Sequence, residues 1–224
     1  MAALAFATFG EHKFSLTLNS MTMKKYLSGI LVSLCLLTAC SKDETEAGAV
    51  NSPITTAVEA RAAFSKINTL WTATLKPVLT KENQTYAGKV LEGPAGGKAV
   101  VNGSFTKSSS SSSSSTRSSS IADVTITFQQ YAVDGLRLDG VLRFYDSYNS
   151  RTACSSSGCA SSTHIYLAYS SKSSAGVANP PVTIEFELNG KTFRDQILLD
   201  ADKEFSTWTV KLTAENKQDF SFSY

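Results

Sequence analysis

Two cysteines and a histidine stand close together in the second half of the chain, and three kinds of chemistry are open to them. Cys154, Cys159 and His164 are spaced C-x4-C-x4-H in a segment rich in serine. A structural zinc site needs four ligands, and no fourth candidate stands nearby. A cysteine–histidine nucleophile needs a free thiolate and a group that orients the histidine. A disulfide needs only the two cysteines, and we predict one between Cys154 and Cys159.

Other strings that resemble catalytic motifs are incomplete. Ser104 and Lys107 form an S-x-x-K string, but penicillin-recognising enzymes also need S-D-N and K-T-G partners. Residues 93–98 are glycine-rich and end in lysine, yet alanine follows where a phosphate-binding loop needs serine or threonine. We therefore predict no catalytic residue, no metal ligand and no cofactor site.

Five aspartates form two groups that a carboxylate mechanism or a cation site could use. Asp134 and Asp139 each precede a glycine, a pairing that turns favour without any ligand. Asp195, Asp200 and Asp202 cluster near the end of an expected strand, where we predict solvated side chains. Asp134 and Asp139 do not match the spacing of a calcium-binding loop.

The first part of the chain has the layout of an export signal. Residues 23–25 read Met-Lys-Lys, residues 27–39 are apolar and uncharged, and a cysteine follows. This is the three-part pattern of a secretory signal, and its apolar run is shorter than the roughly 20 residues that span a bilayer as a helix. Residues 1–22 fit no export pattern, so we expect translation to start at Met23 or Met21.

The residues Leu37-Thr38-Ala39-Cys40 resemble the lipobox of bacterial lipoproteins. The resemblance covers residues 23 to about 46 and implies a signal peptide over residues 23–39, cleavage before Cys40, and lipid such as palmitate attached to that cysteine. Two or more acyl chains anchor a protein stably to a membrane. Ser41 resembles the residue that follows the cysteine in lipoproteins sorted to the outer membrane. The resemblance thus implies an outer-membrane location, on the periplasmic face or the cell surface, with residues 40–55 as lipidated cysteine and flexible tether.

Charge and size restrict the remaining possibilities. The chain has 224 residues and a formal net charge of +2, and from Cys40 onward basic and acidic residues balance. No basic run is present, so we expect no nucleic-acid partner. Residues 56–224 are long enough for one domain with a sizeable core. Export to an oxidising compartment also supports the disulfide prediction.

One amphipathic helix is predicted at the start of this domain, over residues 57–76. Thr56 and Glu59 match a capping box. Apolar residues then recur at helical spacing: Ala60, Phe64, Ile67, Trp71 and Leu75. Pro77 is expected to end the helix at Lys76.

The rest of the domain alternates apolar and polar residues with period two, which predicts antiparallel strands with one buried face. Four dipeptides favour tight turns, and one of the two Asp-Gly pairs is expected to be a bulge: Asn102-Gly103, Asp134-Gly135, Asp139-Gly140 and Asn189-Gly190. The predicted fold is mainly β (α+β), with the N-terminal helix packed on a meander of seven or eight antiparallel strands. A curved sheet or partial barrel satisfies this pattern.

Two serine-rich stretches interrupt the strands. Residues 108–120 are serine apart from Thr116 and Arg117, and we predict a disordered hairpin loop there because serine buries no apolar surface. Residues 147–163 form a second such loop, which carries the cysteine pair. Loops on a sheet scaffold often hold binding sites, but they also tolerate sequence drift, and the sequence does not separate these interpretations.

The lipobox and the lack of a complete catalytic set favour a non-enzymatic envelope lipoprotein, a binding or structural module for a protein or a small apolar ligand. One alternative is an outer-membrane β-barrel protein, because Phe220, Phe222 and Tyr224 alternate at the end of the sequence as in the last strand of such barrels. The second alternative is an envelope hydrolase that acts through carboxylates.

Overall fold

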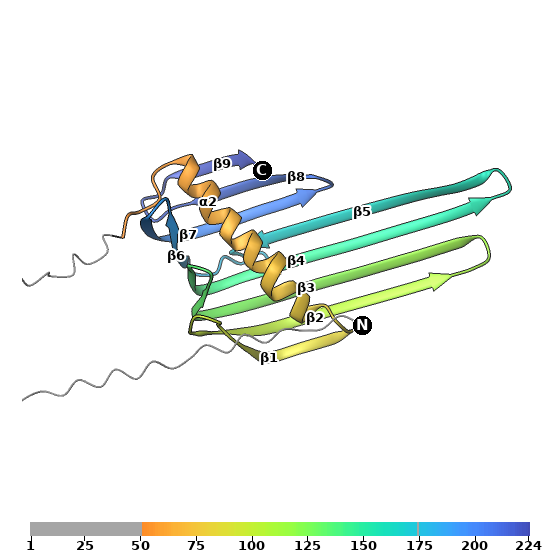
Figure 1. Cartoon of the computed structure of the whole chain (residues 1–224), viewed down its shortest axis with the longest axis horizontal. Coiled ribbons are helices and arrows are strands. Elements are labelled where there is room, and N and C mark those ends of the chain that lie inside the picture. The colour runs from red at the N-terminus through yellow and green to blue at the C-terminus, as the bar shows by residue number, and fades with distance from the viewer. Residues whose placement is uncertain (1–50, 174) are drawn as a thin grey trace, which may run out of the picture. The chain divides into compact units, whose positions relative to one another are not determined.

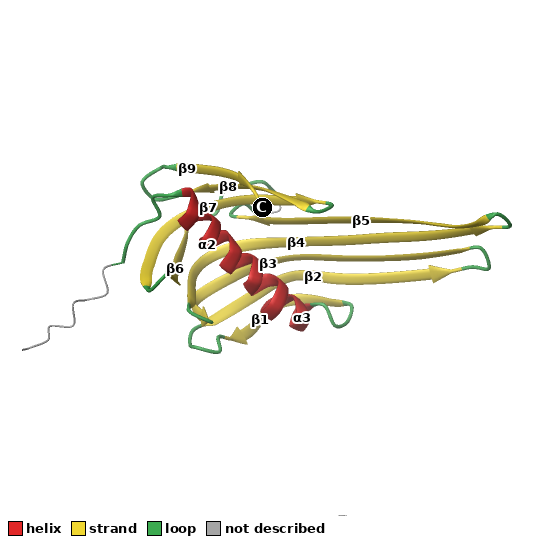
Figure 2. Cartoon of the chain, turned by 45° about the horizontal axis from the view of Figure 1, so that its top comes forward, coloured by secondary structure: helices red, strands yellow, loops and turns green. Residues whose placement is uncertain are grey.

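A helical segment lies across one face of an antiparallel sheet in the computed structural model, which describes residues 51–173 and 175–224 (Figures 1 and 2). The predicted signal peptide, the lipobox with Cys40 and the first part of the tether lie outside the described residues. The fold is mainly β with one helical segment, as predicted.

The helix begins where the sequence predicted it. In α2 (Ala57–Thr69), Thr56 is the N-cap: its hydroxyl accepts the Glu59 N–H at 3.3 Å, and the Glu59 carboxylate accepts the Thr56 N–H at 2.9 Å. Burial alone would raise the pKa of Glu59, but hydrogen bonds from Thr55 and Thr56 lower it below its ordinary value. The capping box therefore stabilises the first turn through an ionised carboxylate.

The helical segment does not end at Lys76 but continues through Pro77 to Leu79. A π-helical turn, η1 (Leu70–Leu75), separates α2 from α3 (Lys76–Leu79), and the Lys76 N–H donates to the carbonyl of Trp71, five residues back. Pro77 falls in the first turn of α3, where it has no N–H to donate back into η1 and where its ring would crowd the carbonyl of the preceding turn in a regular α-helix. The widened turn thus lets the chain stay helical past the proline.

Nine strands make up the sheet in the described part of the chain: β1 (Gln84–Glu92), β2 (Lys98–Ser111), β3 (Ser115–Val133), β4 (Leu136–Ser155), β5 (Gly158–Ser170), β6 (Val182–Leu188), β7 (Lys191–Glu204), β8 (Thr207–Thr213) and β9 (Asp219–Ser223). This is more than the seven or eight predicted. Strand β1 buries only Tyr86, so it shows little of the alternation by which strands are recognised in a sequence.

The sheet follows the order of the chain except at β6. The order is β1-β2-β3-β4-β5-β7-β8-β9, and β6 pairs with both β4 and β7. Strands β5 and β6 occupy successive parts of the space between β4 and β7, because β7 pairs with β6 over residues 191–197 and with β5 over residues 200–204. Pairing through β4, β5, β7 and β6 therefore closes on itself, and the sheet is partly closed at this end.

Aromatic side chains join the helix to the sheet. Trp71 stacks on Phe144 of β4 with ring centroids 4.8 Å apart, and Phe64 meets Trp208 of β8 edge-on at 5.2 Å. The core cluster runs from Ile54 to Phe222. The described residues thus share one hydrophobic core, and residues 51–224 belong to one compact unit of the size of a typical domain.

The end of the predicted tether belongs to the folded domain. Ser52 forms a parallel bridge with Phe193, and Ile54 is fully buried. The Asp195 carboxylate accepts backbone N–H groups from Ile54 at 2.8 Å and Glu215 at 3.0 Å. The prediction that Asp195 is solvated was therefore wrong: it is buried because it satisfies two amides that no strand partner reaches.

The serine-rich stretches are strands, which corrects the prediction of disordered loops. Strand β2 runs to Ser111 and β3 starts at Ser115, while β4 and β5 are separated only by residues 156–157. Serine buries little, but its backbone pairs as well as any other. Here the β2–β3 and β4–β5 hairpins lie side by side, so that β3 and β4 are paired along both edges.

The turn predictions met different outcomes. Asp134-Gly135 and Asn189-Gly190 lie at hairpin tips, as predicted. A bulge lies opposite Asp139, with the extra residue on the β3 side near Gln130, which has a φ of +53°. Asn102-Gly103 is not a turn but lies inside β2. A Cβ at Gly103 would come within 2.1 Å of the Asp123 carbonyl oxygen, so glycine there permits close approach to β3.

Candidate binding surface

Strands β2 to β5 continue beyond the helix-covered part of the sheet as two long hairpins (Figures 1 and 2). We call residues 106–120 and 147–165 of these hairpins the extension. None of the buried hydrophobic residues in the described domain belongs to it. Both of its faces are thus open to solvent, and it adds nothing to the hydrophobic core.

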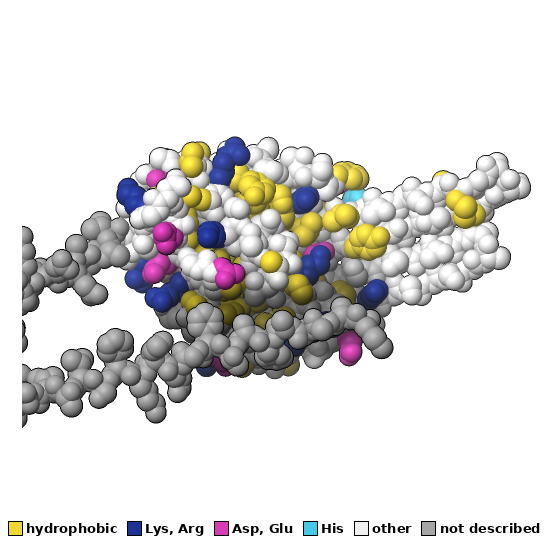
Figure 3. Space-filling model, viewed as in Figure 1, with side chains coloured by type: hydrophobic (Ala, Val, Ile, Leu, Met, Phe, Trp, Pro, Cys, Tyr) yellow, Lys and Arg dark blue, Asp and Glu magenta, His cyan; other side chains and the backbone are white. Residues whose placement is uncertain are grey.

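The extension's helix-side face is a regular array of hydroxyl groups. Strand register aligns two rows across β2, β3, β4 and β5: Ser109, Ser118, Ser150 and Thr163, then Ser111, Thr116, Thr152 and Ser161. The Thr152 and Ser161 hydroxyls are 2.9 Å apart. Figure 3 shows this face of the extension with almost no charged side chains. Each hydroxyl can donate and accept, so the array suits a ligand rich in polar groups.

The opposite face carries positive charge. Arg117 lies directly opposite Arg151, with Ser110 and Ser162 at the ends of the same row. The adjacent row consists of Ser108, Ser119, Asn149 and His164. The extension contains Lys107 and these two arginines but no aspartate or glutamate. A domain with balanced charge therefore presents a locally electropositive surface.

The predicted disulfide is confirmed at the tip of the extension. Cys154 and Cys159 are bonded at an S–S distance of 2.03 Å and close the β4–β5 turn. His164 lies on β5 with Nε2 3.5 Å from a Glu204 carboxylate oxygen, and it meets Phe205 edge-on. The disulfide leaves this histidine no thiol to activate. No cluster of three metal-ligating side chains occurs within residues 51–173 and 175–224.

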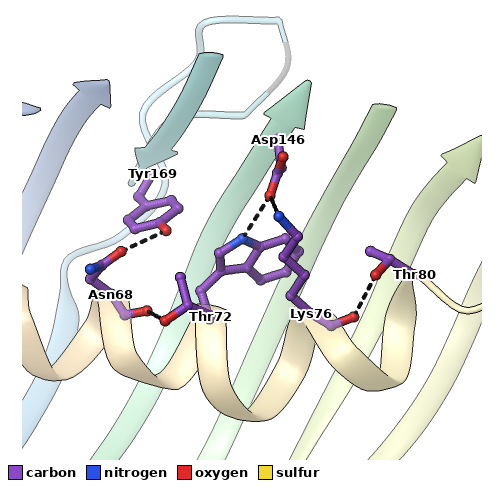
Figure 4. Close-up of polar contacts among 7 residues, drawn as sticks. Asn68, Thr72, Lys76, Thr80, Asp146 and Tyr169 are labelled. Carbon is purple, nitrogen blue, oxygen red and sulfur yellow. Dashed lines mark hydrogen bonds and ion pairs between the residues drawn. The ribbon is translucent and has the colours of Figure 1, made fainter. Parts of the chain in front are cut away.

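A groove of about 290 Å³ lies where α3 meets the base of the extension. Its lining comes from the helix end and from three strands: Lys76, Thr80, Phe105, Lys107, Ser118, Ser120, Ala122, Asp146 and Tyr148. Asp146 is buried, forms an ion pair with Lys76 and accepts the Trp71 indole N–H at 3.4 Å (Figure 4). Its carboxylate is thus committed to holding the helix on the sheet. Tyr148 is about one-third exposed and offers an apolar ring on the groove floor.

Polar groups beside the groove are satisfied by one another. The Tyr169 hydroxyl donates to the Asn68 side-chain oxygen at 2.9 Å, and the Thr72 hydroxyl donates to the Asn68 carbonyl at 2.8 Å (Figure 4). Burial and, to a lesser extent, the charge of Asp146 raise the pKa of Tyr169 far above its usual value. Tyr169 is therefore a neutral donor and not an acid–base group.

The other candidate residues are dispersed. Ser104 and Lys107 lie on β2, where a separation of three puts them on opposite faces of the sheet. Asp134 lies in a turn, and Asp139 accepts a hydrogen bond from Gln130 at 2.8 Å. A glycoside hydrolase needs two carboxylates flanking one bond, and the groove is lined by only one in the described chain.

A second hollow lies beside β7 and β8 and is more apolar. It has a volume of about 190 Å³, with Leu198 and Leu199 in its lining and a Lys172–Asp200 ion pair of 2.7 Å at its rim. Small-molecule sites usually measure about 300 Å³ or more. The hollow is therefore small for the apolar ligand that the sequence suggested.

No family model, no curated protein and no solved structure matches the chain. In the part of the chain that the structure describes, no helix combines the length and the apolar character needed to cross a bilayer.

Sequence reasoning missed the extension, although one signal was available. Residues 106–120 and 147–165 hold three basic residues and no acidic one, a segregation visible in the sequence alone. The pairing of Arg117 with Arg151 was not visible, because it depends on the register between β3 and β4.

The Asp146 contacts lead to a stability prediction. In residues 51–224, Asp146→Ala leaves the buried Trp71 indole N–H without an acceptor, which costs about 1–3 kcal/mol of unfolding free energy. Asp146→Asn keeps an acceptor oxygen and should cost less. Urea unfolding followed by tryptophan fluorescence measures both. Equal stability of the two variants would contradict the role assigned to this carboxylate.

Proposed function

We propose that the chain is an envelope lipoprotein, anchored through lipid on Cys40, whose domain is a non-enzymatic binding module. The single observation that carries the binding role is the extension, a four-stranded sheet without buried hydrophobic residues. The anchor is supported by the sequence from Met23 to Cys40, and it implies the outer membrane, on the periplasmic face or at the cell surface.

The energetics of the extension favour a role in display. Ordering each residue costs roughly 1–2 kcal/mol of conformational free energy, and stable domains offset this cost mainly by apolar burial. The extension orders more than thirty residues by backbone pairing, one disulfide and contacts between exposed side chains such as Thr152 and Ser161, without buried hydrophobic residues. A segment that adds nothing to the core, yet is held as a regular sheet, is suited to presenting groups to a partner.

The groups that it presents favour a polar ligand. Both faces consist mainly of hydroxyls, with the exposed Lys107 at the base of the helix-side face and the exposed Arg117 and Arg151 on the opposite face. The more apolar hollow beside Leu198 is small, and the groove below the extension mixes hydroxyls, two lysines and one tyrosine ring. We therefore place binding on the extension and the adjoining groove, in preference to a site for a small apolar molecule.

The anchor is tested by replacing Cys40 with serine in the full chain, expressed in a bacterium that processes lipoproteins. We expect the wild-type chain to incorporate an alkyne-labelled fatty acid and to fractionate with membranes, whereas Cys40→Ser incorporates no label because the thioether cannot form. Equal labelling of both chains would contradict the anchor.

The display role is tested by shortening both hairpins. Residues 108–119 and 149–164 are each replaced by Asn-Gly, which joins the directly opposed pairs Lys107–Ser120 and Tyr148–Ile165 through two-residue turns. Since no core residue is removed, the unfolding free energy of residues 51–224 should change by no more than about 1 kcal/mol. Association with cell envelopes of the source bacterium, measured by co-sedimentation, should be lost.

Two results would contradict this account. A shortened variant that fails to fold would make the extension structural. A folded variant that still sediments with envelopes would place binding elsewhere on the domain. Deletion of Val177, which is exposed and lies outside both the core and the extension, serves as the control for nonspecific loss.

A further inference from the structure

The opposed arginines of the extension have no acidic partner. Arg117 and Arg151 are cross-strand neighbours, which places their Cβ atoms about 4.5–5.5 Å apart. Like charges directly opposite one another destabilise a sheet. None of the ion pairs among the described residues includes either arginine, and the extension has no carboxylate to offer.

The other arginines of the described domain are placed differently. Arg143 holds the Asp123 carboxylate with two hydrogen bonds of 2.8 Å. Arg137 and Arg194 lie on either side of Glu185 in one cross-strand row. Each of these three arginines thus has an acidic neighbour. Arg117 and Arg151 on the extension differ from them, because neither has one.

Arg61, the remaining arginine of this part of the chain, is engaged by neutral groups. It donates to the Ser223 carbonyl at 3.1 Å, and its guanidinium lies 4.8 Å from the centre of the Phe222 ring. Only Arg117 and Arg151 therefore combine exposure, mutual proximity and the lack of any such contact within the described residues.

We propose that Arg117 and Arg151 bind the acidic groups of a polysaccharide. Guanidinium groups bind sulfate and carboxylate in a planar, bidentate manner, and an anion between the two arginines would remove their repulsion. The neighbouring row of hydroxyls, Asn149 and His164 supplies donors and acceptors for sugar hydroxyls. This inference rests on the proposed function and names its ligand class.

The composition of the extension favours a polysaccharide over other anionic partners. Protein–protein interfaces are enriched in aromatic residues and depleted of serine, whereas serine dominates here. Single-stranded nucleic acid is held by many cations and by aromatic platforms for bases. The two rows here contain two arginines and no tyrosine, tryptophan or phenylalanine, and one exposed ring, Phe205, meets His164 from outside them. Insertion into a lipid surface needs apolar side chains, which these rows lack.

The test compares dextran sulfate with dextran, which share a backbone and differ in charge. Residues 51–224 should bind dextran sulfate measurably at physiological salt, and dextran much more weakly. The double variant Arg117→Gln/Arg151→Gln should lose at least about tenfold in affinity, since each charge-assisted hydrogen bond lost is worth about that factor. Isothermal titration calorimetry measures all of these affinities.

The matched control is Arg137→Gln/Arg194→Gln, which removes the same charge from arginines that flank Glu185. Its affinity for dextran sulfate should stay within about twofold of the wild-type value. Urea unfolding of both double variants checks that neither has lost its fold, and the exposed Arg117 and Arg151 side chains give no reason for such a loss.

Several outcomes would overturn the inference. Residues 51–224 could fail to bind dextran sulfate, or could bind dextran with the same affinity as dextran sulfate. The two double variants could lose the same amount of affinity for dextran sulfate. An oligonucleotide or phosphatidylglycerol vesicles could bind more tightly than dextran sulfate, in a way that also depends on Arg117 and Arg151. The proposed function is tested by a different experiment, the co-sedimentation of the shortened variant with cell envelopes, so the two claims can be contradicted independently. If the shortened variant no longer sediments with envelopes while Arg117→Gln/Arg151→Gln keeps its affinity for dextran sulfate, only the assignment of a polysaccharide ligand to these arginines is contradicted.

Discussion

Backbone hydrogen bonding across β2, β3, β4 and β5 is the interaction on which the rest of the molecule depends. The same four strands serve two parts of the domain: their inner halves carry the buried residues beneath the helix, and their outer halves carry the extension. Register set in the inner halves by apolar packing continues outward without a break in β3–β4 and β4–β5 pairing. Because a slip by one residue would exchange the two faces, the packed core determines which side chains the extension shows on each face.

The boundary between the two halves is where the helix ends. Asp146 lies in the last buried row of the sheet and contacts both Trp71 and Lys76. One step outward, the row of Lys107, Ser120, Tyr148 and Ile165 is no longer covered by the helix. The groove lies at this step because the helix stops there while the strands continue. A ligand on the extension and a ligand in the groove would therefore be adjacent.

Local sequence patterns predicted the features that depend on few residues. The capping box at Thr56, the hairpin at Asn189-Gly190 and the Cys154–Cys159 bond each follow from residues close in sequence. The serine stretches were predicted wrongly because apolar burial was taken as the condition for order, whereas neighbouring strands supply hydrogen-bond partners on both sides of β3 and β4. The prediction of a turn at Asn102-Gly103 was wrong for a similar reason, because Gly103 lies within β2 and allows the backbone of β3 to approach closely. The Arg117–Arg151 pair and the burial of Asp195 depend on long-range register, which no local pattern carries.

The central claim, that backbone pairing holds the extension as a sheet without a core, is tested most directly by amide hydrogen exchange on residues 51–224. We expect the amides of residues 116–120 and 147–153, which belong to β3 and β4, to exchange much more slowly than those of an unstructured chain. Residues 113 and 114 at the β2–β3 turn, whose N–H groups donate no backbone hydrogen bond, should exchange fast and serve as the internal reference. Exchange of residues 116–120 and 147–153 at the rate of this turn would contradict the account, and with it the surfaces on which binding has been placed.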